Sequence, residues 1–289
     1  MADLEALAKA FTGLGIDEKS LIENLGKSHP EHRALFRKRT PHFFIEDERS
    51  FERWNDHCVR LLKHEFVRFK NALVLWAMHP WERDARLVKE ALKKGPQSYG
   101  VIVEIACTRS SEELLGARKA YHSLFDQSIE EDVATHIHGS ERKLLVALVS
   151  AYRMDSRRIP IEDEEVIRIL STRSKAHLKI VYKHYKEVSG NIIHEDLDVS
   201  DLILKETVEC LCSPHAYFSK VLDEAMGSDS HKNTKKGLTR VIVTRADVDM
   251  KEIKEEYMNL FGVSLSKKIE EKANGNYRDF LVTLITRDN

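Results

Sequence analysis

The clearest pattern of apolar and polar positions in the chain runs from Gly237 to Phe261 and is centred on Arg245. After Arg245, apolar residues recur in steps of three and four, at positions 250, 253, 257 and 260. This spacing places them on one face of an α-helix. Asp247 and Asp249 lie just before the stripe, where an acidic side chain can cap a helix and favour its positive end. The stretch therefore predicts a helix, a tight turn and a second helix.

The same pattern occurs around Arg109 and Arg173, and all three copies carry a threonine directly before the arginine. A fourth, less complete copy is centred on Ser28. The four centres lie 81, 64 and 72 residues apart, which indicates an internal repeat of one supersecondary unit. We therefore expect an all-α fold of four repeats, each of about five helices.

Flanking helices complete the copies. Apolar spacing predicts helices at 81–94 and 213–226, which open copies two and four, and at 66–78, 140–152 and 276–285, which close copies one, two and four. The predicted repeats span residues 1–78, 79–153, 154–212 and 213–289.

The first copy is the longest. It predicts a short helix at 3–11, helices at 18–27 and 30–39, and then the segment HFFIEDERSFERWNDHC at 42–58. We interpret that segment as an inserted or extended loop that leads to the helix at 66–78.

The third copy has no room for an opening helix. Only nine residues separate Tyr152 from Glu162, and they include Pro160, which disfavours a helix interior. Either this copy lacks its first helix or the chain has lost a segment. In the first case four helices remain, and they should expose apolar surface, for example at Leu170 or Val181.

Composition adds few constraints. Lys plus Arg number 46 and Asp plus Glu 47, so the net charge of −1 favours no particular partner and any electrostatic argument must be local. No apolar run approaches the length of a membrane span, and MADLEALAKAF predicts an amphipathic helix start, not a signal peptide. The four cysteines have no zinc-type spacing, so we expect a reduced, cytoplasmic protein.

Motifs of catalysis are missing from the sequence. It contains no phosphate-binding GxxxxGK loop, no triad spacing and no HExxH among its 14 scattered histidines. No basic face with interleaved aromatic residues is apparent. The sequence therefore predicts neither an enzyme nor a nucleic-acid-binding protein.

Three segments resemble the annexin family: EIACTRSSEELLGARKAYHSLFDQSIEEDVA, VIRILSTRSKAHLKIVYKHY and LTRVIVTRADVDMKEIKEEY. They look most like plant annexins, and HPWERDA with GARKAYHSLFDQS resembles a divergent type within that branch. The resemblance covers the chain except residues 154–161. It implies four five-helix repeats packed as a slightly curved disc, whose convex face binds anionic phospholipid, usually through calcium.

The family's calcium motif, a glycine-rich loop completed by a carboxylate, matches only the first copy. Here the resemblance implies a site at Phe11, Gly13 and Gly15. The carboxylate position falls on histidine or lysine (His64, His136 and Lys272 in copies one, two and four), and neither side chain offers a hard oxygen ligand. Glu65 and Glu271 lie one place away, so a shifted carboxylate remains open. We expect weak calcium binding, in repeat one only, with Glu65 as the acidic ligand.

Two further groups of residues match family features. The family's central polar cluster falls on Asp84, Glu104, Arg109, Arg240 and Arg245. This cluster is either a structural ion-pair network, which we favour, or an ion pathway.

Cys107 and Cys210 match two cysteines proposed as a redox pair in plant annexins. They are either such a pair, close together with at least one thiol accessible, or simply small buried side chains, which we favour. The histidine linked to peroxidase activity in plant annexins is Lys27 here, which argues against that activity.

The loops that have lost the calcium motif carry basic residues instead. These are Lys93 and Lys94 in copy two, Arg157 and Arg158 in copy three, and Lys232, Lys235 and Lys236 in copy four. In annexin packing all three loops would share the convex face. We hypothesise that these cations bind phospholipid headgroups directly; the alternative is that they are ordinary solvated charges at helix ends.

The predicted function is peripheral binding to anionic phospholipid membranes, with weak or partial calcium dependence. One alternative is a stress-signalling or interaction scaffold that has lost most membrane binding, and another is a channel-like cation conductor. The predicted partners are anionic membranes and other annexins, and the predicted location is the cytoplasm and its membrane surfaces.

Overall fold

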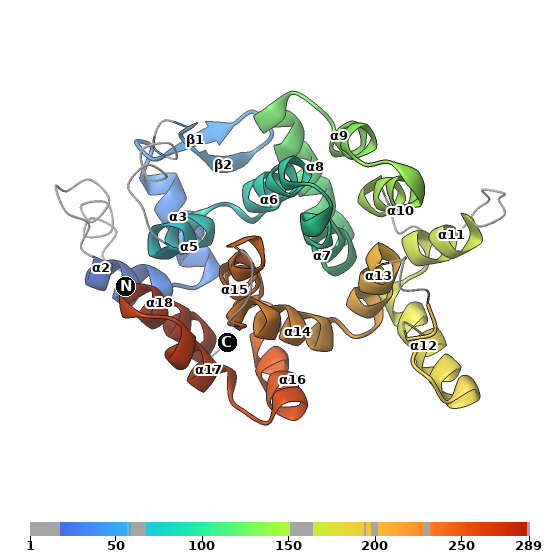
Figure 1. The fold of residues 1–289 in the computed structure, drawn as a ribbon. Coiled ribbons are helices and arrows are strands. Elements are labelled where there is room, and N and C mark those ends of the chain that lie inside the picture. Colours follow the sequence, from blue (N-terminus) through green and yellow to red (C-terminus); the bar gives the residue numbers. More distant parts are fainter. Residues whose placement is uncertain are drawn as a thin grey trace. The chain divides into compact units, whose positions relative to one another are not determined.

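The computed structural model describes residues 18–56, 58, 68–150, 164–193, 195–197, 202–227 and 232–287. The helices in the first part of the chain are α2 (Glu18–Leu21), η1 (Ile22–Gly26), α3 (Pro30–Arg39), α5 (Arg68–Ala77), α6 (Pro80–Lys94), η2 (Pro96–Ser98), α7 (Gly100–Thr108), α8 (Ser111–Phe125), α9 (Ile129–His136) and α10 (Gly139–Ser150). Those that follow are α11 (Glu164–Thr172), α12 (Lys175–Ser189), α13 (Leu202–Cys212), α14 (Pro214–Met226), α15 (Lys232–Arg245), α16 (Met250–Phe261), α17 (Leu265–Lys272) and α18 (Gly275–Thr286). The predicted all-α fold is confirmed (Figure 1).

The chain divides into two compact units. The first unit combines residues 1–79 with residues 218–289, and the second unit contains residues 80–217. The N-terminal and C-terminal parts of the sequence therefore share one unit. The bounds of the four repeats stay a prediction.

The second unit is built around α7, whose sequence GVIVEIACT is apolar on nearly every face. Such a helix must be surrounded, and α7 packs against α6, α10 and α13. Helices α6 and α8 approach closely because Gly116 has no side chain; a Cβ atom there would lie 2.0 Å from Cε2 of Trp81. Capping boxes at Ser110 and Ser128 fix where α8 and α9 begin.

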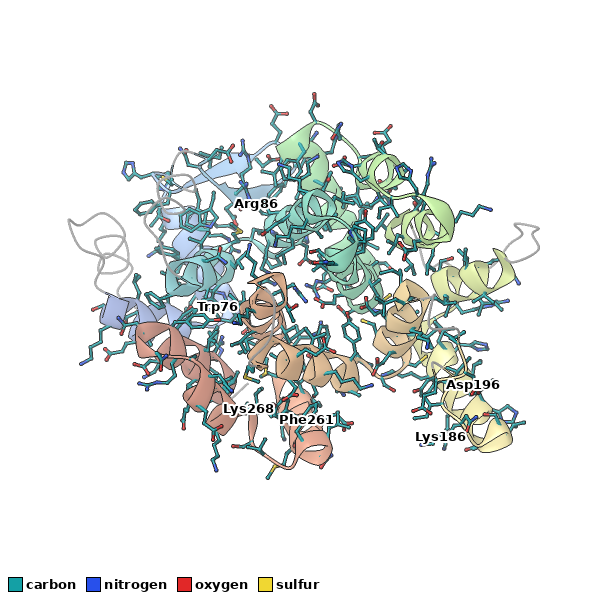
Figure 2. All side chains as sticks on the ribbon, viewed as in Figure 1. Trp76, Arg86, Lys186, Asp196, Phe261 and Lys268 are labelled. Atoms are coloured by element: carbon teal, nitrogen blue, oxygen red, sulfur yellow. The ribbon has the colours of Figure 1, made fainter. Side chains whose placement is uncertain are left out.

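The first unit is centred on α5, which packs against α15 and α18. Phe69 of α5 meets Phe280 of α18 edge-on, with ring centroids 5.6 Å apart. Trp76, near the end of α5 (Figure 2), is 1% exposed, and its indole Nε1 donates to the carbonyl oxygen of Leu25 at 2.9 Å. The contacts of α5 with α15 and α18 join the less complete first copy to the fourth copy.

Residues 42–58 contain a β-hairpin, which the sequence interpretation missed. Strands β1 (Phe44–Asp47) and β2 (Phe51–Trp54) pair antiparallel, with Phe44 opposite Trp54. The rings of this pair lie 4.2 Å apart and both are buried. The three-residue connection places Ser50 at φ 64°, a left-handed conformation that suits a tight hairpin. Cross-strand aromatic packing thus stabilises a segment that we interpreted as a loop.

The helices predicted at 30–39, 66–78, 81–94, 140–152, 213–226 and 276–285 are confirmed within two residues at each end. The helix predicted at 18–27 is also present, although its second half, Ile22–Gly26, is wound as a π-helix. Pro30 occupies the first turn of α3, where its missing N–H costs nothing. The helix predicted at 3–11 lies outside the described residues.

The third copy contributes α11, α12 and α13 to the described part of the chain, and residues 153–161 lie outside it. Apolar side chains on α11 and α12 are exposed: Val166 by 50%, Ile180 by 68%, Val181 by 43% and Val188 by 74%. The predicted exposure is confirmed at Val181, whereas Leu170 is buried.

Candidate functional site

Arg109 and Asp84 form a buried ion pair in the second unit. The Arg109 Nε and Nη2 atoms donate to the two Asp84 carboxylate oxygens at 2.6 and 2.9 Å. Burial alone would lower the pKa of Arg109, but the charge and hydrogen bonds of Asp84 raise it above its ordinary value. The guanidinium therefore stays charged, and the fork geometry fixes both side chains.

Glu104 lies on α7, five positions before Arg109, and is also buried. Its carboxylate accepts from the Tyr217 hydroxyl at 3.4 Å. The Thr108 hydroxyl donates to the Glu104 carbonyl oxygen at 2.6 Å and accepts from Arg109 Nη1 at 3.1 Å. The Lys175 ammonium donates to the Arg109 carbonyl oxygen at 2.9 Å, so the start of α12 is held to the end of α7. Three of the five predicted cluster residues, Asp84, Glu104 and Arg109, thus lie in one unit with polar partners.

Arg240 and Arg245 belong to the first unit, on α15. Arg240 is half-buried, and Arg245 donates from Nε and Nη2 to both carboxylate oxygens of Asp249 at 2.8 and 2.5 Å. The Arg245 guanidinium also lies 4.8 Å from the ring centroid of Phe218. A single cluster of all five residues remains a prediction.

Two acidic residues have roles that the sequence interpretation assigned wrongly. Asp249 occupies the cap position of α16 but makes no side-chain cap hydrogen bond, because its carboxylate is taken by Arg245. Asp247 contacts the guanidinium groups of Arg33 and Arg287 instead. Helix capping and ion pairing compete for the same short carboxylates, and nearby arginines decide the outcome here.

Cys107 and Cys210 are both free thiols, each only 1% exposed. The accessible thiol expected of a redox pair is therefore contradicted for these two residues. The half-buried Cys212 was not predicted, although it lies close enough to Cys107 to respond to its charge. Burial first, and then Cys107, raise the pKa of Cys212 to about 11. The burial of Cys107 and Cys210 favours their interpretation as small packing side chains.

The residues predicted to bind calcium, Phe11, Gly13, Gly15 and Glu65, lie outside the described residues. At the equivalent carboxylate positions, His136 ends α9 with its Nδ1 3.0 Å from Asp132, and Lys272 ends α17 exposed to solvent. Across the described ranges, no three His, Cys, Asp or Glu side chains are grouped to hold a metal ion. The family motif uses backbone carbonyl oxygens and a single carboxylate, so the restriction of calcium to repeat one stays a prediction.

The basic residues that were predicted in the loops without a calcium motif lie mostly on helices. Lys93 and Lys94 are in the last turn of α6, where Lys93 is exposed and Lys94 pairs with Glu90 at 2.5 Å. Lys232, Lys235 and Lys236 were expected in a loop, but α15 begins at Lys232 and includes all three. Arg157 and Arg158 lie outside the described residues.

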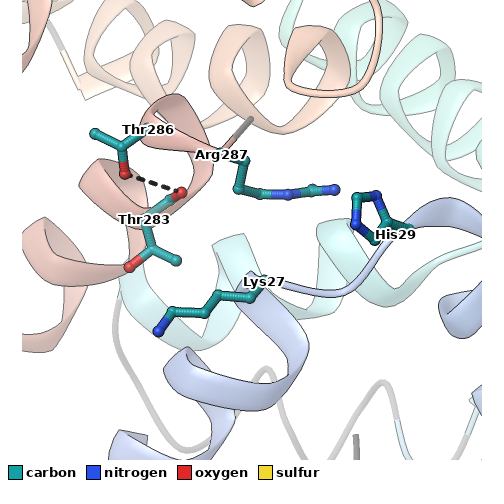
Figure 3. Close-up of a pocket in the computed structure, with 5 residues that line it drawn as sticks. All are labelled: Lys27, His29, Thr283, Thr286 and Arg287. Atoms are coloured by element: carbon teal, nitrogen blue, oxygen red, sulfur yellow. Dashed lines mark hydrogen bonds between the residues drawn. The ribbon is translucent and has the colours of Figure 1, made fainter. Parts of the chain in front are cut away.

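The first unit also contains a pocket of about 280 Å³ that the sequence interpretation missed. It is lined by Lys27, His29, Thr283, Thr286 and Arg287 (Figure 3). The first two residues join η1 to α3, and the others end α18. These two groups of residues are more than 250 positions apart in sequence, so no local pattern brings them together.

No helix in the described ranges is long and apolar enough to cross a bilayer. The closing helices, such as α10 and α18, carry apolar residues but are only 12 residues long.

Comparison with known proteins agrees with the repeats and the fold. The annexin family model matches residues 83–148 and 217–284, which fall in copies two and four. Annexin D4 of Arabidopsis thaliana is 54% identical over 313 aligned positions, which cover 99% of this chain and 98% of the relative. Annexin Gh1 of Gossypium hirsutum is 39% identical and covers 98% of this chain and 94% of its own length. The chain belongs to the annexin family, on its plant branch.

Solved structures agree with the fold. A mutant of annexin A8 superimposes with a TM-score of 0.79 at 27% identity and covers 99% of this chain and 94% of that structure. Annexin III gives a TM-score of 0.81 at 24% identity, with the same coverage. The Annexin D4 alignment spans 313 positions against 289 residues here, so at least 24 positions have no counterpart in this chain.

Proposed function

We propose that this annexin binds anionic phospholipid membranes with only partial calcium dependence, because fixed cations replace the ion in some repeats. Annexins as a family are peripheral, calcium-dependent phospholipid-binding proteins. In this chain calcium would be held weakly, in repeat one, by the carbonyl oxygens of Phe11, Gly13 and Gly15 with Glu65. Other annexins are proposed partners, and the cytoplasmic face of membranes is the proposed location.

The start of α15 carries this proposal. Backbone N–H groups make the N-terminus of a helix positive, so lysines in the first turns are unfavourable unless an anion is present. The first five residues of α15 nevertheless include Lys232, Lys235 and Lys236. Exposed N–H groups beside ammonium groups are the usual features of a phosphate-binding helix end. A phospholipid headgroup would bring negative charge to this helix end.

The lysines at the end of α6 support the proposed membrane binding less strongly. Lys93 and Lys94 lie at the negative end of their helix, where lysine is favourable without any lipid. Lys94 already has a carboxylate partner in Glu90. We therefore expect α15 to contribute more to membrane binding than α6.

The size of the effect is sufficient for reversible binding. Each basic residue near an anionic leaflet is worth about 1 kcal/mol, so seven contribute several kcal/mol after repulsion and imperfect reach. Screening over about 8 Å at physiological salt makes this attraction strongly dependent on ionic strength.

The experiment is co-sedimentation with phosphatidylserine vesicles in EGTA at low and high salt. Wild type should bind at low salt and dissociate at high salt, and a variant with Lys94→Glu, Arg158→Glu and Lys236→Glu should not bind. A matched variant changes three exposed lysines instead, with Lys38→Glu, Lys186→Glu and Lys251→Glu. It has the same net charge as the first variant and should keep most of the binding. Binding that requires calcium and ignores the first three changes would contradict the proposal.

A second candidate function is an interaction scaffold. The exposed apolar side chains of α12, Ile180, Val181 and Val188, favour it, because side chains of this kind are common at protein interfaces. A chain that ignores vesicles with and without calcium, and that self-associates or binds another annexin, would support the scaffold instead.

A further inference from the structure

The pocket of the first unit is positively charged. Its lining combines an ammonium group, a guanidinium group and an imidazole, from Lys27, Arg287 and His29, with the hydroxyl groups of Thr283 and Thr286. Figure 3 shows Arg287 extending from the end of α18 toward His29, with Lys27 on the neighbouring side. Among the described residues no carboxylate lines it. A pocket of this composition selects an anion.

Arg287 is the least satisfied of these groups. Its side chain is only 5% exposed, and neither terminal nitrogen, Nη1 or Nη2, forms a hydrogen bond with the described residues. Nη1 lies 3.0 Å from Oδ1 of Asp247, which is an ionic contact without hydrogen-bond geometry. Buried donors that lack an acceptor cost free energy, which an added acceptor would recover.

The carboxylate of Asp247 is shared, because both Arg33 and Arg287 contact it. Arg33 is satisfied, because it also donates from Nη1 to the Ser28 carbonyl oxygen at 2.6 Å. Arg287 therefore shares its carboxylate partner, and its guanidinium lines the pocket with Lys27 and His29.

The arrangement is held in place without a ligand. The guanidinium carbons of Arg33 and Arg287 lie 3.7 and 5.0 Å from the ring centroid of Trp76, whose face attracts cations. Trp76 is itself fixed by its hydrogen bond to Leu25. A cation fixed by stacking loses little further freedom on binding, which favours affinity.

Two features of α18 make the pocket less favourable for an anion. The helix ends at the pocket, and helix C-termini are negative, but the Lys254 ammonium donates to the Ile285 carbonyl oxygen at 2.7 Å and offsets part of that charge. The Thr283 and Thr286 hydroxyls donate to carbonyl oxygens of their own helix. They therefore contribute less than the three basic side chains.

We propose that this pocket binds a phosphate group, either free in solution or as the headgroup of a lipid. A phosphate offers several acceptor oxygens in a tetrahedral arrangement, which suits donors from separate side chains that line one pocket. None of the residues that line the pocket is among those proposed to bind calcium or among the lysines on α15, so the proposal goes beyond the membrane function above.

The first test is calorimetric titration of the full chain with inorganic phosphate in EGTA, at constant ionic strength. Wild type should show saturable binding. Lys27→Gln should weaken it about tenfold or more, because a charge-assisted hydrogen bond is lost, and Lys27→Arg should recover most of the affinity. Lys27 is exposed, so neither change threatens folding. Lys251→Gln, a change of equal charge on α16, should leave the affinity unaltered.

Three further variants complete this test. Thr283→Val should cost less than about threefold, since that hydroxyl is already engaged. Asp288→Asn removes the carboxylate next to Arg287 in the sequence and should leave the affinity equal or higher. Arg287→Gln should abolish binding while the fold, followed by circular dichroism, remains. Wild type that shows no saturable binding up to about 10 mM phosphate, a range of very weak affinity, would overturn the proposal. So would equal binding by Lys27→Gln.

Vesicles containing phosphatidic acid distinguish the two sources of phosphate. In EGTA and high salt, a lipid headgroup ligand predicts vesicle binding that Lys27→Gln weakens and inorganic phosphate competes away. A free phosphate ligand predicts no vesicle binding under these conditions, because salt screens the other basic residues, while the calorimetric result stands. Lys232→Glu with Lys236→Glu should reduce vesicle binding at low salt without altering the phosphate titration, so failure of either proposal is recognised separately.

Discussion

Arg109 on α7 and Asp84 on α6 are joined by two parallel hydrogen bonds, with side chains only 8% and 2% exposed. A buried pair of this kind contributes little net stability compared with apolar residues of the same size, but removing one partner strands a buried charge. The pair therefore fixes how α6 and α7 meet.

The first prediction concerns this pair. Arg109→Met should lower the stability of the second unit by about 3–5 kcal/mol, because the Asp84 carboxylate is left buried and unpaired. The double variant Arg109→Met with Asp84→Leu should recover much of the loss. Thermal denaturation of each variant measures this. The exposed pair Lys183 and Glu187 is the control, and breaking it should cost less than about 1 kcal/mol. If the double variant is as unstable as Arg109→Met alone, the unpaired Asp84 carboxylate is not the cause of the lost stability.

The second prediction concerns acid stability through Asp132. This carboxylate is 2% exposed, accepts from the Lys89 ammonium at 2.5 Å and from the Tyr121 hydroxyl, and lies 3.0 Å from His136. Burial raises the pKa of Asp132, but the bonds from Lys89 and Tyr121 outweigh it and hold the pKa below its ordinary value.

Because the folded-state pKa of Asp132 is depressed, its stabilising contribution is fully present above the unfolded pKa of about 4. The contribution is lost as pH falls through the folded-state pKa. Asp132→Asn should therefore destabilise the protein at pH 7 but reduce the further loss of stability between about pH 5 and pH 2.5. Urea unfolding across this range measures the effect, with Glu112→Gln, at an exposed position, as the control. An unchanged acid slope in Asp132→Asn would contradict the assignment.

The third prediction concerns the thiols. In the native protein iodoacetamide should not modify Cys107 or Cys210, since both are buried. Cys212 should react slowly at pH 8 and faster as pH rises toward its pKa of about 11, because only the thiolate attacks. Mass spectrometry of peptides after timed labelling distinguishes the sites, and labelling in denaturant supplies the control. Rapid modification of Cys107 or Cys210 would restore the redox-pair hypothesis.

The sequence predicts the helices well because their apolar spacing survives in nearly every copy. Leu178 on α12 and Ile253 on α16 follow the repeat pattern, and both are buried. The hairpin was missed because its stability depends on the Phe44 and Trp54 rings meeting across strands, which no helical period reveals.

The candidate sites were harder to predict because they depend on contacts distant in sequence. Asp247 lies beside a helix start, yet its partners are Arg33 and Arg287, and Arg33 is 214 positions away. The same distance hides the pocket at Lys27, since its other wall is the last helix. Motif spacing can rank calcium loops, but it does not reveal which charges meet in the fold.

The last prediction concerns the shortened third copy, where buried and exposed apolar residues alternate on α12. Leu178 is 3% exposed, whereas Ile180 is 68% and Val188 is 74% exposed. If no opening helix covers this face, Leu178→Ala should cost about 2–5 kcal/mol, and Ile180→Lys and Val188→Lys should each change stability by less than about 0.5 kcal/mol.

Thermal denaturation at two protein concentrations measures these effects and separates folding from association. Ile180→Lys that costs as much as Leu178→Ala at every concentration would mean that this face is covered within the chain, and the absence of an opening helix would no longer explain its exposure. A cost that appears only at the higher concentration would mean that a second copy covers the face, because stability gained by association depends on protein concentration. We expect neither outcome: Ile180→Lys should leave stability unchanged at both protein concentrations. Helix α12 already buries Leu178 and is held at its start by Lys175.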